Sequence, residues 1–553
     1  MPVPEPTSTA PRVLPPLLLA LFPLDPLQDP APRPQADLIP QGRQHLDRGE
    51  LDLALALFER ADAQSQGTLP TRMWVWRTWL EQGRINDALD AIDELRLAGT
   101  ESPDLDYLYG IAFFRKGKQY VDQDVPPTTT GLAFEDARTF LSKATAADPD
   151  KYYDAFLPLA ESAWHTRRYE VGRAAALRAI EIAPADPHPP FVLSLLLFQR
   201  FVDVDADEAR RAEADALWEE TVERLGEAAR KLGAPGTDAQ RTLAADIGLQ
   251  LGYMYEQRQK LDLAGAAFAD SLGWNPAGAD YADLHGRFPV EQYRSLLREA
   301  ERLFVERYGA ENVADALLLW WLGYTSFELA DWAACEAAFE QSVRKWPLYV
   351  DSWFYVGFAR FKQAKLDGAA DALLTGYALE PAKLVSAIEG DPEPHLGALS
   401  LVIDWCAKRD RTLDAAYLCD LRTGAFAGNW EWWNDQGLLF REAGKLFLAT
   451  GLPEDAERAP ELFERSYEAY VVALSLAPDK PHLVNDTAVI LHYFLGRDLA
   501  RAREMYLTCI RMADELLQSE GLDDEERARA AKARSDAIEN VEDVEARLRA
   551  KKR

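Results

Sequence analysis

The chain has 553 residues, of which 48% are hydrophobic and 27% charged, so it can bury a large core. A single globular core stops growing near ~250–300 residues, whereas a repeat protein lengthens its core with each repeat. The net charge is −30, from 91 acidic and 61 basic residues, which disfavours binding to nucleic-acid phosphates or anionic membranes. The acidity either favours basic partners or serves only to keep an elongated protein soluble.

The first 37 residues form a proline-rich leader that differs in composition from the rest. Residues 13–24 read VLPPLLLALFPL, an apolar run too short to span a bilayer, which takes about 20 residues. Its length suits the core of a signal peptide, but the run contains prolines and no clean cleavage site follows. Export to the periplasm or envelope and a cytoplasmic location therefore both stay open. No other segment approaches the length of a transmembrane helix.

The main body of the chain repeats itself every 34 residues. Gly323 and Gly357 are 34 residues apart, and so are Pro347 and Pro381. A self-match at this period is typical of stacked helix–turn–helix units. We expect the small residues to lie where helices approach closely and the prolines to end each second helix.

Two adjacent segments carry the pattern most fully, 316–347 and 350–381. Their pattern residues are Leu319, Leu322, Gly323, Ala330, Cys335, Phe339, Ser342 and Pro347, then Trp353, Val356, Gly357, Ala364, Ala369, Leu373, Gly376 and Pro381. This pattern resembles the tetratricopeptide repeat family, and the resemblance covers most of the chain. It implies an all-α protein, an α-solenoid of helix–turn–helix repeats that form a right-handed superhelix.

In chain order, the resemblance predicts N-terminal repeats over 38–200, a charged helical insertion over 201–237 and further repeats over 238–512. Residues 289–308 and 394–422 are predicted as helical repeats that lack the consensus. Two more insertions interrupt the period: 119–131 between the two helices of a unit, and 446–460 as a widened turn. Such insertions are either functional loops or tolerated additions to the surface.

Residues 513–553 are predicted as a charged C-terminal capping helix. Its apolar positions step by three or four residues, which places them on one helix face: Ala530, Ala533, Ala537, Val541, Val544 and Leu548. A terminal helix with a polar outer face would close the solenoid. A coiled-coil contact with another chain is the alternative, which the alanines in the seam disfavour.

Chemistry-bearing motifs are missing from the sequence. It contains no phosphate-binding glycine loop, no HExxH or GxSxG motif and no zinc-type cysteine and histidine cluster. The four cysteines are predicted to be buried thiols rather than disulfides. His482 and His492, with Asn485 and Asp486 between them, are either a polar site or ordinary helix residues. We therefore predict no catalytic residues, metal or cofactor, although folding can assemble a polar cluster that the sequence does not reveal.

The resemblance also implies where a partner would bind. In the family, positions 2, 5, 9, 12 and 13 of each first helix line a concave groove. The predicted peptide-binding residues here are Trp320, Tyr324, Phe327, Phe354, Phe358, Phe361 and Lys362, with Asn434 and Asn485 in later units. These rings either line an accessible groove or form core between first helices. Position 11, often aromatic in the family, is Ser326 and Arg360, which puts the facing of these helices in question.

The sequence thus predicts a non-enzymatic scaffold that binds a protein or peptide, either basic or with apolar anchors, in the concave groove. The alternative is a structural component of a cell-envelope or secretion assembly that uses its convex faces and terminal helix.

Overall fold

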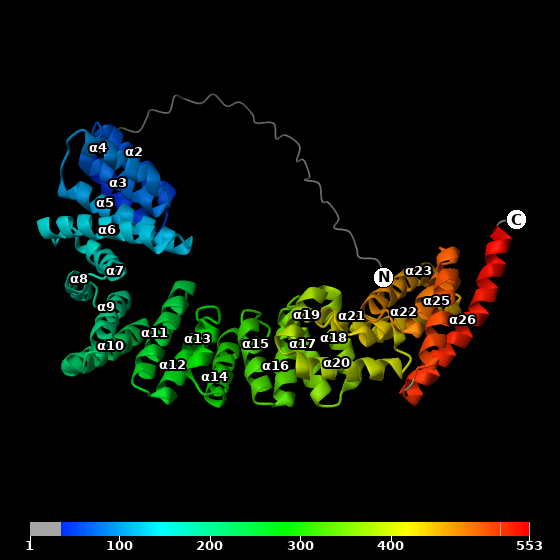
Figure 1. The fold of residues 1–553 in the computed structure, drawn as a ribbon. Helices are drawn as coiled ribbons and strands as arrows, with labels where there is room; N and C mark the ends of the chain where they lie inside the picture. Colours follow the sequence, from blue (N-terminus) through cyan, green and yellow to red (C-terminus); the bar gives the residue numbers. More distant parts are fainter. Residues whose placement is uncertain (1–34, 520, 552–553) are drawn as a thin grey trace, which may run out of the picture. The chain divides into compact units, whose positions relative to one another are not determined.

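The computed structural model describes residues 35–519 and 521–551, and the predicted leader lies almost wholly outside this range. Every regular element in the described part is helical, with 26 α-helices and no strand (Figure 1). The all-α prediction is therefore confirmed. None of these helices is both long and apolar enough to cross a membrane.

The chain divides into two compact units, with the boundary at Arg224. The first unit contains α1 Gln35–Asp47, α2 Leu51–Gln64, α3 Leu69–Glu81, α4 Ile85–Leu97, α5 Pro103–Asp122, α6 Pro127–Ala147, α7 Phe156–His165, α8 Tyr169–Ile182 and α9 His188–Asp205. The boundary falls within α10, Arg211–Leu232, which belongs to the predicted charged insertion and buries one stripe that includes Ala214, Leu225 and Ala228.

The second unit begins with α11 Asp238–Gln257, α12 Leu261–Trp274, α13 Tyr281–Arg287, α14 Val290–Tyr308, α15 Ala316–Glu328, α16 Trp332–Lys345, α17 Val350–Lys362 and α18 Leu366–Leu379. It continues with α19 Pro381–Gly390, α20 Pro392–Ala407, α21 Thr412–Ala425, α22 Trp430–Thr450, α23 Pro453–Leu476, α24 Pro481–Val489, α25 Leu499–Leu517 and α26 Asp524–Lys551. The stretches predicted as helical repeats without the consensus, 289–308 and 394–422, are helical.

The two helices of a repeat meet at a glycine in the first helix. A methyl group added at Gly323 would lie 2.6 Å from Cδ2 of Phe339, and one at Gly357 would lie 2.8 Å from Cγ of Leu373. Gly252 has the same relation to Phe268, at 2.5 Å. In each case the large residue stands 16 positions after the glycine. The tetratricopeptide-like pairing predicted from the 34-residue step is confirmed by this contact.

The turn between paired helices contains one residue in the left-handed region. This residue is Gly49, Gly83, Arg167, Gln259, Ala330 or Ala364, with φ between 54° and 77°. Left-handed backbone costs an L-residue roughly 1–2 kcal/mol because its Cβ crowds the following carbonyl oxygen. The two best-formed repeats, with alanine there, therefore hold strain that the repeats with glycine avoid.

Two hairpins are longer than the others because both of their helices are extended. Helix α5 has 20 residues where α3 has 13, and α22 has 21. The seven extra residues are about two helical turns. Each long hairpin carries a second glycine contact one heptad away from the first: Gly110 meets Leu141 and Gly117 meets Phe134, while Gly437 meets Tyr470 and Gly444 meets Phe463.

The sequence interpretation of these two insertions was wrong. Residues 119–131 do not form a loop between helices, since α5 runs to Asp122 and α6 starts at Pro127. Likewise residues 446–460 do not widen a turn, because only Gly451 and Leu452 separate α22 from α23. Additional glycine contacts between the paired helices make helix extension more favourable than an open loop.

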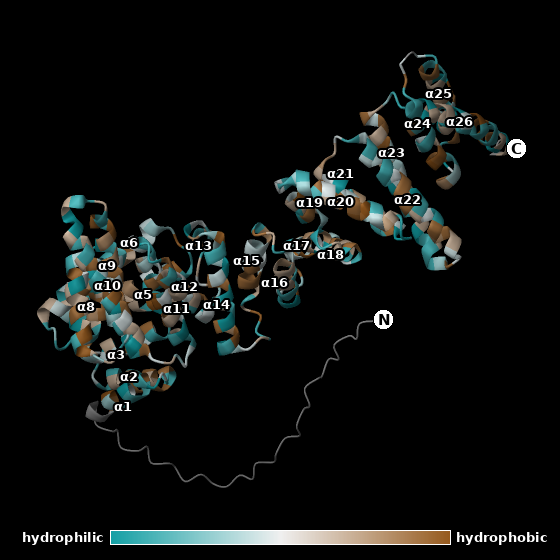
Figure 2. Cartoon of the chain, turned by 90° about the horizontal axis from the view of Figure 1, so that it is seen from below, coloured by the Kyte–Doolittle hydropathy of each residue, from teal (hydrophilic) through white to brown (hydrophobic). Residues whose placement is uncertain are grey.

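The C-terminal helix packs through the stripe predicted for it. Ala530 is buried, Ala533, Ala537 and Val544 are buried in a cluster that includes Tyr506 of α25, and Val541 and Leu548 pack against that cluster. Hydrophilic residues cover most of the rest of α26 (Figure 2). The single apolar face is confirmed, and its burial within the chain supports the capping interpretation.

We predict that Gly323→Ala lowers the free energy of unfolding by about 1–3 kcal/mol, because the added methyl group overpacks against Phe339. Gly265 in α12 is the matched control, since a methyl group added there meets no atom within 4 Å. Gly265→Ala should be neutral or stabilising by about 0.5–1 kcal/mol. Thermal and urea unfolding of both variants checks this, and equal stability of the two would contradict the contact.

A second prediction concerns the strained turns. Ala330→Gly and Ala364→Gly should each stabilise the protein by up to about 1 kcal/mol, because glycine adopts positive φ without a Cβ clash. The reverse change at the same turn position, Gly83→Ala, should destabilise by a similar amount although space is free around it. Differential melting temperatures measure both, and a fall in stability with Ala330→Gly would refute the strain.

Candidate functional site

The predicted aromatic residues of α15 form a ladder along one face of that helix. The ring centroids of Trp320 and Tyr324 are 5.4 Å apart, and those of Tyr324 and Phe327 are 6.3 Å apart. All three side chains are half-buried. Tyr355 of α17, which the sequence analysis did not select, packs on the ladder with its ring centroid 5.2 Å from that of Phe327. This ladder is thus partly core and partly surface.

Phe354 and Phe358, predicted as peptide-binding residues with a core position as the alternative, take the core position in the structure. Both side chains are buried, with 4% and 6% of their surface exposed. His395 of α20 covers them, its ring edge-on to both at centroid distances of 4.9 and 4.8 Å. On the same helix α17, Phe361 is half-buried and Lys362 is exposed, with its ammonium 5.1 Å from the Phe358 ring centroid. The core interpretation therefore applies to Phe354 and Phe358.

The two asparagines lie apart from this ladder, in later repeats. Asn434 is half-buried on α22. Asn485 is buried on α24, where it donates to Asp486 Oδ1 at 3.2 Å and accepts from Asn540 of α26 at 3.5 Å. Asn485 thus joins α24 to the terminal helix rather than presenting a free amide. His492 is also buried, close to the hydroxyl of Tyr506, so it does not form an open site with His482.

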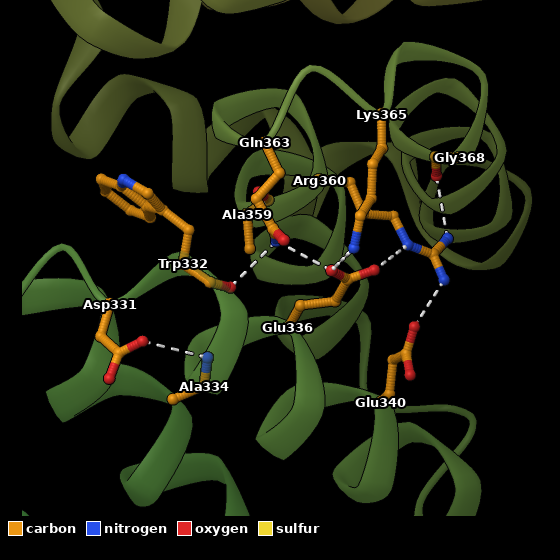
Figure 3. A network of polar contacts seen from close by, with 10 residues as sticks. All are labelled: Asp331, Trp332, Ala334, Glu336, Glu340, Ala359, Arg360, Gln363, Lys365 and Gly368. Carbon is orange, nitrogen blue, oxygen red and sulfur yellow. Dashed lines mark hydrogen bonds and ion pairs between the residues drawn. The ribbon is translucent and has the colours of Figure 1, made fainter.

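Arg360 occupies position 11 of its repeat, where the family often has an aromatic residue. Its side chain points toward the preceding repeat (Figure 3). Its Nε donates to Glu336 Oε1 at 3.0 Å and its Nη2 donates to Glu340 Oε1 at 2.7 Å. Glu336 also accepts from Gln363 at 2.8 Å and from Lys365 at 2.5 Å. One buried carboxylate of α16 therefore holds the last turn of α17 and the turn that follows it.

The pKa of Glu336 is lowered in this network. Burial alone would raise the pKa, but the hydrogen bonds from Lys365, Arg360 and Gln363 outweigh the loss of solvation. Because its folded-state pKa lies below the unfolded value near 4.5, the carboxylate stabilises the fold fully above that pH. This contribution is lost as the pH falls through the folded-state pKa.

We predict that Glu336→Gln destabilises the protein at pH 7 by about 1–3 kcal/mol, because buried donors lose a charged acceptor. The difference from wild type should shrink as the pH falls below about 4.5, where the carboxylate of the unfolded protein takes up a proton, and it is lost once the pH passes the lower pKa of the folded protein. Glu340→Gln is the control. The Glu340 side chain is more exposed than that of Glu336, and within this network it accepts a hydrogen bond from Arg360 alone. Unfolding of the three proteins between pH 7 and pH 3 tests this, and a pH-independent difference would contradict it.

A hollow of about 640 Å³ lies in the first unit, on the first helices α3, α5 and α7. Its apolar lining consists of Leu80, Ile85, Tyr107, Ile111, Phe114 and Pro158. Arg115, Lys118, Gln119 and Asp122 from the C-terminal half of α5 also line it, as does Gly83 of the α3–α4 turn.

The cations of the hollow are all paired with carboxylates. Arg77 donates to Asp154 at 2.5 Å, and the Tyr107 hydroxyl donates to the same carboxylate oxygen at 2.9 Å. Arg115 donates to Glu81 at 2.5 Å and to the Leu80 carbonyl at 3.1 Å. Lys118 pairs with Glu161 at 3.3 Å. Burial raises the pKa of Tyr107 well above its ordinary value, so its hydroxyl stays protonated.

Sequence reasoning missed the polar half of this hollow, namely Arg77, Arg115, Lys118 and Asp154. One sequence feature could have indicated this half of the hollow, namely that Gly110 and Gly117 are seven residues apart. Two such glycines on one helix indicate that the helix is long enough to extend past the turn of the neighbouring repeat. Within the described residues, no group of three His, Cys, Asp or Glu side chains is arranged to hold a metal ion. We call the apolar side chains of the hollow its floor and the charged side chains, whose cations are paired with carboxylates, its rim.

No family model and no curated protein matches the chain. Solved structures do match, among them one of Naa15/Naa10 bound to HypK-THB, at 12% identity over 93% of this chain and 99% of the other, with a TM-score of 0.25. Yeast Tom70 matches at 11% identity over 93% and 96%, with a TM-score of 0.21. A chain of the APC/C hetero-tetramer Cut9-Hcn1 matches at 11% over 91% and 96%, with a TM-score of 0.22. At these TM-scores the likeness carries no argument about function.

Proposed function

We propose that this protein is a non-enzymatic scaffold that binds a segment of another protein in the hollow on α3, α5 and α7. The observation that carries the proposal is the hollow itself, about 640 Å³ with an apolar floor. Binding pockets for small ligands typically occupy about 300–1,000 Å³, so the hollow is large enough to take up side chains of a partner. Because three successive first helices build it, an extended or helical segment can lie across several repeats.

The floor and the rim have different roles in this proposal. Ile111 and Phe114 supply apolar surface whose removal from water favours binding. The ion pairs of Arg77 and Arg115 orient a partner by offering guanidinium groups and carboxylate oxygens at fixed positions. These pairs also occupy the carboxylates with guanidinium groups, whereas general acid–base catalysis needs a group that is free to contact the substrate. This supports a binding role over a catalytic one.

The α15 ladder is a second candidate contact surface. Trp320, Tyr324 and Phe327 keep part of their surface exposed, and half-buried aromatic rings are frequent anchors at protein interfaces. Phe361 and Lys362 of α17 also keep exposed surface and stay in the proposal, as does the half-buried Asn434. The buried residues Phe354, Phe358 and Asn485 are left out.

The net charge of the chain also limits which partners are favoured electrostatically. With a net charge of −30, basic segments are attracted and nucleic acids are repelled. The proposed partner is therefore a protein segment that presents an apolar anchor for Ile111 and Phe114, with basic residues beside it.

We predict that Phe114→Ala weakens the binding of peptides selected on the full-length protein from a random displayed library by about tenfold or more, since a lost aromatic anchor typically costs 2 kcal/mol or above. The control is Phe113→Ala on the same helix. Phe113 packs on Tyr109 and Phe140 and does not line the hollow. Fluorescence anisotropy gives the affinities, and circular dichroism checks that both variants stay helical.

The same peptides distinguish the two candidate surfaces. If Trp320→Ala abolishes binding while Phe114→Ala does not, the α15 ladder is the binding surface and the hollow is not. If neither variant changes the affinity of any selected peptide, the scaffold proposal is wrong for both surfaces.

A further inference from the structure

The second long hairpin opens a hollow of its own. About 310 Å³ of space lies between the α20–α21 turn and the C-terminal extension of α22. The turn contributes Asp410 and Arg411, the start of α21 contributes Thr412, Leu413 and Asp414, and α22 contributes Ala443, Leu446, Phe447 and Thr450. We call this place the α22 ledge. It exists because α22 continues about two turns past the point where ordinary first helices end.

The α22 ledge is built in the same way as the hollow on α5. There the extension of α5 provides Lys118, Gln119 and Asp122, the α3–α4 turn provides Gly83, and the start of α4 provides Ile85. In both cases the C-terminal part of a lengthened first helix extends past the turn of the preceding repeat. The ledge therefore follows from the insertion and is separate from the surfaces considered above.

The floor of the ledge is apolar and open to solvent. Leu446 is 51% exposed, although it lies beside the half-buried Leu413 and Phe447. At the tip of the same hairpin, Leu448 and Leu452 are also about half exposed, at 51% and 49%. Apolar surface of this kind on a helix extension is costly in water unless something covers it.

The rim of the ledge has an excess of negative charge. Arg411 is shared by three carboxylates, at 2.6 Å from Asp371, 2.6 Å from Asp414 and 3.5 Å from Asp367. Asp410 is exposed at the left-handed turn position beside them. The two other cations of this turn are engaged elsewhere, since Lys408 pairs with Asp404 and Arg409 lies over the Trp405 ring.

We propose that the α22 ledge is a docking surface for a basic amphipathic segment of another protein. An apolar side chain of that segment packs on Leu446 and Phe447, and neighbouring lysine or arginine residues face Asp410, Asp414 and Asp371. The excess carboxylates select the sign of the partner's charge, and the apolar floor supplies the affinity. The occupant is a different chain, because a second copy would bring another strongly acidic surface to an acidic rim.

The test uses the full-length protein and a labelled amphipathic helical peptide of leucine and lysine, with a matched peptide in which glutamate replaces lysine. Leu446→Gln should weaken binding of the Leu/Lys peptide about tenfold, since it removes the exposed apolar anchor. Asp410→Asn should weaken binding about threefold and reduce its salt dependence, while the asparagine still tolerates the left-handed turn. Controls are Leu132→Gln on the other long hairpin, where Leu132 is 68% exposed, and Asp90→Asn on α4.

Support requires that both ledge variants bind more weakly than wild type, that both controls match wild type, and that the Leu/Glu peptide does not bind. Equal binding of the Leu/Lys peptide to wild type and Leu446→Gln overturns the proposal, because the attraction is then only the general acidity of the chain. Multi-angle light scattering measures the oligomeric state of the wild type and of Leu446→Gln as a further test. A wild-type dimer that becomes monomeric with Leu446→Gln would show that a second copy covers the ledge, and the proposal would be wrong.

Discussion

The close contact between a glycine of the first helix and a large residue of the second is the constraint on which the rest of the structure depends. Gly323 and Phe339 are 16 residues apart, as are Gly357 and Leu373, and no side chain larger than hydrogen fits at the glycine without displacement of the partner. This contact fixes how near the helices of a pair lie and which residues face each other. Spacing, turn geometry and the placement of the core all follow from it.

The same contact accounts for the two long hairpins. When Gly117 is accompanied by Gly110, or Gly444 by Gly437, the helices can pack over two more turns in the same register. The inserted residues then extend the helices instead of forming loops. The extended helices stand beyond the neighbouring turn, and the spaces beside them are the hollow on α5 and the α22 ledge. A steric rule of the core thus generates the concave surfaces at which we place binding.

Polar contacts between repeats are of a different kind, because one carboxylate accepts hydrogen bonds from several donors. Glu336 accepts from Arg360, Gln363 and Lys365, and in a later repeat Asp420 accepts from Tyr377, Gln436 and Arg465. A carboxylate that accepts several hydrogen bonds holds the helices around it in one arrangement. It is also unavailable to a partner, which separates these networks from the binding surfaces.

The sequence by itself determined the 34-residue step, the helix pairs and the apolar stripe of α26, because these depend on local period and on which residues are small. It also placed Trp320, Tyr324 and Phe327 on a first helix. Only the tertiary structure decided which rings are exposed: His395 covers Phe354 and Phe358 from the next repeat, and the sequence of one helix does not contain that neighbour. The tertiary structure likewise decided that the two insertions near residues 119 and 446 lengthen helices, because the choice between loop and helix depends on packing against a partner helix.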